Sequence, residues 1–251
     1  MRAPSNPSLE RRPREAGRLS SNVRFANTTT MALTLFGLRR SVYTRIVRLA
    51  LEEKRVPYRL TEVEIFGPDG VPTEHRLRHP FGRIPVLDHD GLSIFETAAI
   101  TRYIDERFEG PRLQPVEAGA RARMNQVIGV LDSYAYRPMV WGIFVQQVRL
   151  PMQGLPSDEQ QITKSIGEAS AALAFLEGLA PSSASLTGNE FSLADIHAYP
   201  MLCYLALAPE GAALLQQYHR LHEWLARMRG RASVQATVTP YEPEAHAATR
   251  I

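Results

Sequence analysis

Hydrophobic and polar positions follow two different periods along the chain, and the change falls near residue 110. In the first part, short apolar runs with the spacing of strands enclose stretches whose apolar residues recur every three to four positions. This pattern predicts a strand at 33–36, a helix at 41–54, a strand at 58–65, two strands at 85–88 and 92–95, and a helix at 97–108. Asp90-Gly91 between the paired strands supplies the positive φ of a tight hairpin.

The order strand-helix-strand followed by strand-strand-helix is typical of a thioredoxin-like domain. We therefore predict an α/β thioredoxin-like domain (βαβ-ββα) over residues 31–109, a Pro- and Gly-containing linker at 110–117, and an all-helical domain over 118–235. The helices expected in the second domain lie at 118–149, broken or bent near Pro138, and at 158–180, 192–206 and 210–230. Residues 236–251 are expected to form a loose tail.

Charge changes the interpretation of the first 30 residues. The chain carries a formal charge of +3, with 44% hydrophobic and 22% charged residues, but six arginines and two glutamates place +4 on residues 1–30. The remainder is therefore near −1, and nucleic-acid binding loses its main support. Residues 1–30 are polar and are expected to be a disordered leader. Two explanations remain open, a true start of translation at Met31 and an organelle-targeting peptide.

From the sequence we expect no membrane span, no metal site and no internal disulfide. No window approaches the ~18 continuous apolar residues of a membrane span, so we expect no membrane association. The single cysteine, Cys203, cannot form an internal disulfide, which fits a cytoplasmic protein, and is expected to be a small buried hydrophobe. His75 and His79 have the spacing of a metal pair, but no third ligand lies nearby and no metal is expected.

Ser41 stands at the start of the first predicted helix, directly after the first strand. Backbone N–H groups at such a position point toward a bound anion, and a serine hydroxyl adds a hydrogen bond. This is the pattern needed to keep a thiol ionised, because a thiolate is the reactive form of sulfur. The plain alternative is that Ser41 only caps the helix. Arg39 and Arg40 precede it; they either raise the local potential or are solvated loop arginines.

Two further runs point to a known family. They are His79-Pro80-Phe81-Gly82-Arg83-Ile84-Pro85-Val86-Leu87 and Ile94-Phe95-Glu96-Thr97-Ala98-Ala99-Ile100-Thr101-Arg102-Tyr103-Ile104. With the segment around Ser41, the chain resembles the glutathione S-transferase family, and most closely its phi class with a serine active site. The resemblance covers residues 33–108 closely and the helical remainder loosely.

The resemblance implies a role for each matching residue. Ser41 would activate the glutathione sulfur, and a cis Pro85 would expose the Ile84 backbone to the cysteinyl part of the ligand. Glu96 would meet the γ-glutamyl ammonium, while Thr97 and the helix start would bind the neighbouring carboxylate. Arg83 would lie near the glycine end. Helix capping by Glu96-Thr97 and a solvated Arg83 are the alternatives, and the basic pair of phi enzymes is replaced by Gly70 and Val71.

The helical part adds one structural motif and one group of aromatic residues. Phe191, Ser192, Asp195 and Ile196 match a capping box with its hydrophobic staple. An apolar pocket for an electrophile is expected from Tyr134, Trp141 and Phe144, with Tyr136 and Met139 nearby; core packing is the alternative for each of these side chains.

These features predict a transferase that uses glutathione as co-substrate and requires no metal. Its Ser-stabilised thiolate would conjugate apolar electrophiles or reduce organic hydroperoxides, and the resemblance implies a homodimer. The alternative is a non-catalytic member of the same fold that binds a ligand or a protein. The sequence does not identify the second substrate.

Overall fold

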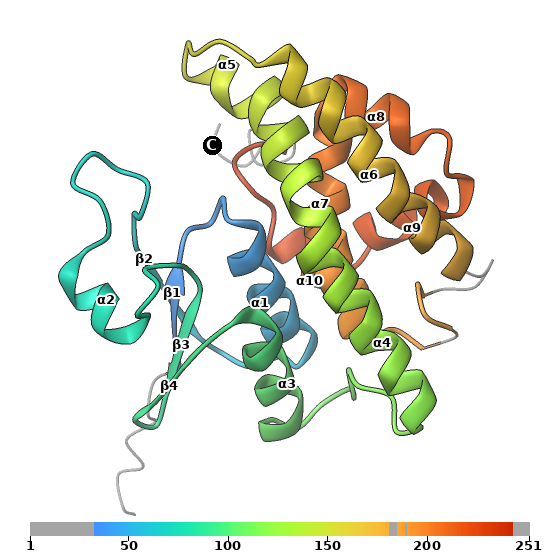
Figure 1. Ribbon diagram of the computed structural model, residues 1–251. Coiled ribbons are helices and arrows are strands. Elements are labelled where there is room, and N and C mark those ends of the chain that lie inside the picture. The colour runs from blue at the N-terminus through green and yellow to red at the C-terminus, as the bar shows by residue number, and fades with distance from the viewer. Residues whose placement is uncertain (1–32, 181–184, 189, 243–251) are drawn as a thin grey trace, which may run out of the picture. The chain divides into compact units, whose positions relative to one another are not determined.

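The computed structural model describes residues 33–180, 185–188 and 190–242 (Figure 1). The predicted leader and residues 243–251 of the predicted tail lie outside the described residues. The first domain consists of β1 (Thr34–Gly37), α1 (Val42–Glu53), β2 (Arg59–Glu62), α2 (Thr73–Arg78), β3 (Val86–His89), β4 (Leu92–Phe95) and α3 (Thr97–Arg107).

The four strands form one mixed sheet in the order β2-β1-β3-β4. β1 runs parallel to β2 and antiparallel to β3, and β3 pairs with β4 as a hairpin, as the Asp90-Gly91 dipeptide predicts. Leu35 of β1 faces Leu60 and Leu87 in the register and is fully buried. α1 and α3 contact each other beside the sheet (Figure 1), which confirms the thioredoxin-like arrangement.

α2 is absent from the sequence prediction. Its six residues bury only His75, so the segment carries no apolar stripe that periodicity could detect. The Nε2 of His75 donates to the carbonyl oxygen of Arg83 at 2.7 Å, so α2 fixes the loop that leads into β3.

The end of β1 approaches α1 closely. A Cβ on Gly37 would lie 2.3 Å from the Oγ1 of Thr44, whose side chain is fully buried in the first turn of α1. Only glycine permits this approach. The close contact fixes the turn between β1 and α1, on which Ser41 lies.

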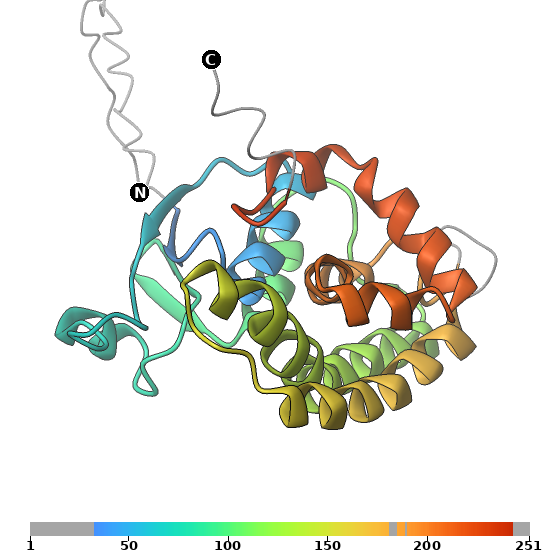
Figure 2. The same cartoon turned by 90° about the horizontal axis from the view of Figure 1, so that it is seen from above.

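The second domain is helical. It contains α4 (Ala118–Val130), the π-helices η1 (Leu131–Ala135) and η2 (Arg137–Arg149), α5 (Leu150–Met152), α6 (Glu159–Leu179), α7 (Leu193–Leu207), α8 (Pro209–Leu215), α9 (His219–Arg229) and α10 (Ala232–Ala236). α7 is buried over most of its length and contacts α1, α4 and η2, so it joins the two domains (Figure 2). Within the described residues, no single helix is long and apolar enough to cross a membrane; α7 with α8 passes only as a pair bent by 120°.

Of the break or bend expected near Pro138, the break does not occur. Helical turns continue without interruption from α4 through η1 and η2. The helix changes its winding before this residue, from the α-helical turns of α4 to the π-helical turns of η1 and η2, which have i→i+5 hydrogen bonds.

Two other expectations need correction. The single helix predicted over 210–230 is divided into α8 and α9, because the carboxylate of Glu177 on α6 accepts from the backbone N–H groups of Arg220 and Leu221 and caps a new helix start. The predicted loose tail begins too early. Thr237, Thr239 and Glu242 are buried.

Candidate active site

Ser41 is the N-cap of α1. Its Oγ accepts a hydrogen bond from the backbone N of Thr44 at 3.3 Å, and its own backbone N donates to the carbonyl oxygen of Leu38 at 2.9 Å. A hydroxyl has one donor and two acceptor positions, so this oxygen can cap the helix and still donate to a ligand. The two explanations offered for Ser41 are therefore compatible. The first turn of α1 contains no acidic residue to offset the positive end of the helix dipole.

A cleft of about 660 Å³, here called the main cleft, opens beside Ser41. It brings together all of the binding residues expected from the first domain, which are Ser41, Arg83, Ile84, Pro85, Glu96 and Thr97. The Ile84–Pro85 peptide bond is cis, as the resemblance implies. Three separate segments, the β1–α1 turn, the loop before β3 and the start of α3, thus converge on one cavity.

Glu96 starts α3 in an unusual conformation. Its φ is +70°, a value that side chains other than glycine rarely adopt and that is concentrated at functional sites. Its side chain makes no capping hydrogen bond to the helix and is exposed toward the cleft, whereas Thr97 behind it is buried. The capping explanation for Glu96 is therefore not realised, and its carboxylate remains available to a cation.

Asp132 is a second carboxylate in the main cleft, and sequence reasoning did not identify it. It comes from η1 of the helical domain, whereas Glu96 precedes α3 of the first domain. The pKa of Asp132 is raised to about 6, chiefly because burial in the cleft removes the carboxylate from water. The negative charge of Glu96 also raises this pKa, whereas a hydrogen bond with the Tyr43 hydroxyl lowers it. Two carboxylates that repel one another favour a cation between them. No local sequence motif marks Asp132.

The aromatic wall of the main cleft is formed by Tyr136 and Trp141. The Nε1 of Trp141 donates to the Tyr136 hydroxyl at 3.0 Å, and the Tyr136 ring lies 4.5 Å from that of Tyr43. A spacing of five residues brings Tyr136 and Trp141 to the same side because the turns between them are π-helical. Tyr134 does not line this cleft. It is 69% exposed and faces a separate groove between the π-helices and α6, which corrects the expected pocket.

A small pocket of about 50 Å³, here called the inner pocket, also borders Ser41. Phe144 lines it, as expected of an electrophile pocket, together with Trp141, Tyr136, Val140, Tyr204 and Tyr241. Its lining is mainly apolar and aromatic. Tyr204 and Tyr241 were missed because they come from α7 and from the segment predicted as a tail.

The two arginines before Ser41 do not act as free cations. Arg40 forms an ion pair with Glu64, and the backbone N and the Nε of Arg39 lie 3.1 Å and 3.8 Å from the Oε1 of Glu62. These carboxylates offset the charge of both guanidinium groups. The explanation of Arg39 and Arg40 as loop arginines is therefore favoured over a raised potential at the sulfur.

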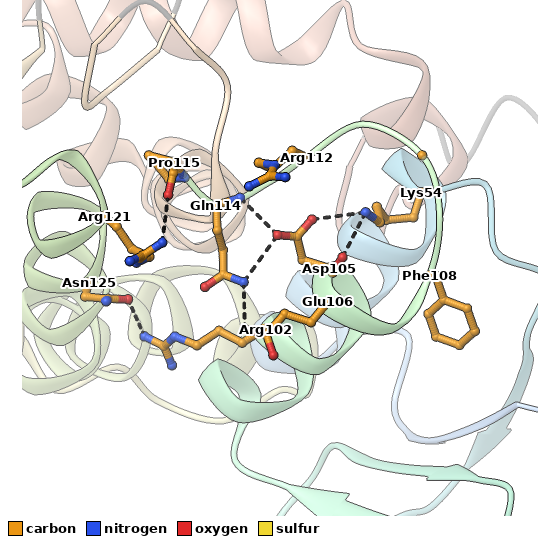
Figure 3. Close-up of a pocket in the computed structure, with 11 residues that line it drawn as sticks. Lys54, Arg102, Asp105, Glu106, Phe108, Arg112, Gln114, Pro115, Arg121 and Asn125 are labelled. Atoms are coloured by element: carbon orange, nitrogen blue, oxygen red, sulfur yellow. Dashed lines mark hydrogen bonds and ion pairs between the residues drawn. The ribbon is translucent and has the colours of Figure 1, made fainter. Parts of the chain in front are cut away.

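A polar cavity of about 650 Å³ between α3, the linker and α4 lies apart from Ser41 (Figure 3). Most of its charged groups already bind other parts of the protein. The Nζ of Lys54 lies 3.1 Å from the Oδ1 of Asp105, and Arg102 donates to the Oδ1 of Asn125 at 2.6 Å. The carboxylate of Asp105 also accepts from the backbone of Leu113 and Gln114. The cavity therefore anchors the linker to α1 and α3. Over the described residues, no cluster of three side chains suited to a metal is assembled.

Comparison with known proteins agrees with this geometry. Residues 35–112 match the family model "Glutathione S-transferase, N-terminal domain", and residues 159–227 match "Glutathione S-transferase, C-terminal domain". Glutathione S-transferase F14 of Arabidopsis thaliana is 30% identical over 193 residues, which is 75% of this chain and 76% of the relative.

Two solved structures show the same similarity. Glutathione transferase F7 from Populus trichocarpa aligns with a TM-score of 0.73 at 27% identity, over 82% of this chain and 97% of that one. A glutathione S-transferase from Methylobacillus flagellatus with bound glutathione aligns with a TM-score of 0.68 at 28% identity, over 83% of this chain and all of the other. The chain belongs to the glutathione S-transferase family.

Proposed function

We propose that this protein transfers glutathione to apolar electrophiles, with Ser41 holding the sulfur as a thiolate between the main cleft and the inner pocket. The observation that carries the proposal is the position of Ser41. It lies at the helix start, borders both cavities, and shares the main cleft with the cis Pro85 and with Glu96. The binding of glutathione by a solved relative supports the choice of ligand.

The tripeptide can be placed by its charges. Glu96 and Asp132 together offer negative charge to the γ-glutamyl ammonium, and the N-terminus of α3 with Thr97 offers donors to the adjacent carboxylate. The Ile84 backbone beside the cis Pro85 receives the cysteinyl unit. This placement directs the sulfur toward Ser41 and leaves the glycine carboxylate near Arg83.

Ser41 must then lower the thiol pKa. A decrease of about two units from the ordinary value near 8.5 requires roughly 2.7 kcal/mol of preferential binding of the anion. The end of a helix contributes about 0.3–1 kcal/mol, and a hydrogen bond to a charged acceptor about 1.5–3 kcal/mol. Both contributions are needed, and the dual geometry of the Ser41 hydroxyl allows them to act together. The thiolate attacks the electrophilic carbon, the leaving group departs with the bond electrons, and a thioether forms.

Thiol titration in Ser41→Ala tests this proposal. Wild-type protein should be retained by immobilised glutathione and should show the ultraviolet difference absorbance of a bound thiolate. In Ser41→Ala, the pKa of the bound thiol should rise by about 1–2 units, because a charge-assisted hydrogen bond is lost. Turnover should fall accordingly over a panel of electrophiles and hydroperoxides.

Asp158→Ala is the matched control, since Asp158 caps α6 through the backbone N of Gln161 at 2.9 Å and does not line the main cleft. It should lose a similar cap without altering the thiol pKa. A wild-type protein that binds no glutathione, or an identical thiol pKa in wild type and Ser41→Ala, would refute the proposal. A non-catalytic binding protein would show neither the thiolate signal nor turnover.

A further inference from the structure

The segment after α10, residues 237–242 and here called the C-terminal strap, lies against α1. Arg48 of α1 donates to the carbonyl oxygens of Ala236 and Thr237, at 3.2 Å and 3.4 Å. One turn earlier, Arg45 forms an ion pair with Glu242 at the far end of the strap. Both ends of this short segment are therefore held by arginines on the helix that begins at Ser41.

The ion pair between Arg45 and Glu242 is buried. The Arg45 side chain is 0% exposed, and its two terminal nitrogens donate to the two carboxylate oxygens of Glu242 at 2.8 Å and 3.2 Å. The same carboxylate accepts from the backbone N and the Oγ1 of Thr239 at 2.8 Å and 2.9 Å, and from the Sγ of Cys203 at 3.4 Å. A buried carboxylate with this many donors has one favourable position, which determines where the strap lies.

Arg45 stands in the first turn of α1, where its backbone N makes the helical hydrogen bond to the carbonyl oxygen of Ser41 at 2.9 Å. The strap is therefore attached one turn away from Ser41. Tyr204, which packs beside the strap, donates its hydroxyl to the carbonyl oxygen of Arg40 at 2.7 Å. The strap and the turn that carries Ser41 are thus fixed by the same few side chains.

Tyr241 is the strap residue that lines the inner pocket next to Ser41. Its ring packs edge-on against Phe144 and Tyr204, with ring centroids 5.1 Å and 5.8 Å apart. We propose that Tyr241 is a specificity-determining residue for the apolar group attached to the sulfur, and that the Arg45–Glu242 ion pair is the positioning device that holds it in the pocket wall. This inference rests on the proposed function, since it concerns the second substrate of the same site.

Binding of S-hexylglutathione, relative to binding of glutathione, measures the contribution of the pocket wall without requiring turnover. In Tyr241→Ala, this ratio of affinities should fall by about tenfold, because the hexyl chain loses an aromatic contact, while the affinity for glutathione itself stays unchanged. Tyr241→Phe keeps the ring and should keep the ratio. Tyr134→Ala is the control, since Tyr134 lies outside both cavities. An unchanged ratio in Tyr241→Ala would overturn the inference.

Cys203 reports on the ion pair independently of glutathione. It is the only cysteine of the chain, it is 3% exposed, and its thiol donates to Glu242. Glu242→Gln should speed its reaction with an aromatic disulfide reagent by about tenfold while circular dichroism stays unchanged. Because this substitution leaves the Arg45 charge without a counter-ion, the double variant Arg45→Met with Glu242→Met removes the pair without stranding a charge.

Both variants should also lower the S-hexylglutathione ratio, as Tyr241→Ala does. Slow Cys203 labelling and a wild-type ratio in the folded double variant would overturn the role of the ion pair. A wild-type protein that bound neither ligand would instead refute the proposed function, and Cys203 labelling would still decide whether the ion pair holds the strap.

Discussion

Asp132→Asn tests whether the two carboxylates of the main cleft bind the ammonium of glutathione. The pKa of Asp132 is raised to about 6, chiefly because the cleft walls remove it from water, and the charge of Glu96 adds to the effect. An ammonium is attracted only by the ionised form. As pH falls through 6, Asp132 takes up a proton, and its contribution to binding is lost.

The magnitude follows from this pKa. At pH 7 Asp132 is about nine-tenths ionised, and at pH 5 about one-tenth, so glutathione affinity should be about tenfold weaker at pH 5 than at pH 7. Bound ammonium must in turn lower the pKa of Asp132. Binding near pH 6 should therefore release a proton, which calorimetry detects as a heat that depends on the ionisation enthalpy of the buffer.

Three variants separate Asp132 from other titrating groups. Asp132→Asn should bind more weakly at pH 7 and lose the decline between pH 7 and pH 5. Glu96→Gln should move the midpoint below 6, because the neighbouring negative charge that raises the pKa of Asp132 is removed. Asp69→Asn, in an exposed loop, should behave as wild type. An affinity that does not change between pH 5 and pH 7, or a decline that persists in Asp132→Asn, would refute this reasoning.

Two predictions concern buried polar groups of α7. Asp195→Ala strands the backbone N–H groups of Leu186 and Ser192 and the Nε1 of Trp224, so urea unfolding should show a loss on the order of 4 kcal/mol; a loss below about 1 kcal/mol would contradict the bond pattern. Burial lowers the pKa of His197 to about 3, so only the unfolded chain binds its proton between pH 6.5 and 3, and stability is lost as pH falls through that range. From pH 7 to pH 5, wild type should lose about 2 kcal/mol more than His197→Asn; equal losses would exclude this role.

The glutathione side of the site was predictable because its signals are local. Ser41 follows a strand and precedes a helix within a few residues, and Glu96-Thr97 stands at the start of the next helix after the hairpin. Each side chain is placed by the element in which it lies, and hydrophobic periodicity identifies those elements. The cis state of Pro85 has no periodic signal and came from the family resemblance alone.

The apolar side was predicted only in part. Trp141, Phe144 and the nearby Tyr136 line the cavities beside Ser41, whereas the π-helical turns that bring Tyr136 and Trp141 together have no signal in the sequence. Tyr134, two residues away from Tyr136, faces another groove, because side chains two residues apart point to nearly opposite sides of a helix. Tyr241 depends on an ion pair between residues separated by 197 positions. The C-terminal strap has no apolar periodicity, so its sequence does not indicate that it is buried. Its burial is explained only by the ion pair with Arg45 of α1.

The tripeptide side and the apolar side of the site are formed by different parts of the fold, so the second-substrate specificity can change while glutathione binding is kept. The groups that would bind the tripeptide belong to turns that the sheet and its helices fix, so a change there disturbs the fold and the thiolate together. The inner pocket shares the Ser41 turn, but much of its apolar wall comes from η2, α7 and the C-terminal strap, which lie outside that turn. Substitutions at Phe144 or Tyr241 can therefore alter the shape of the apolar wall while leaving Glu96, Thr97 and the Ser41 hydroxyl in place. Two wall elements are nevertheless tied to the start of α1, the strap through the Arg45–Glu242 ion pair and α7 through the hydrogen bond from Tyr204 to the Arg40 carbonyl, so loss of either contact should reach the sulfur as well.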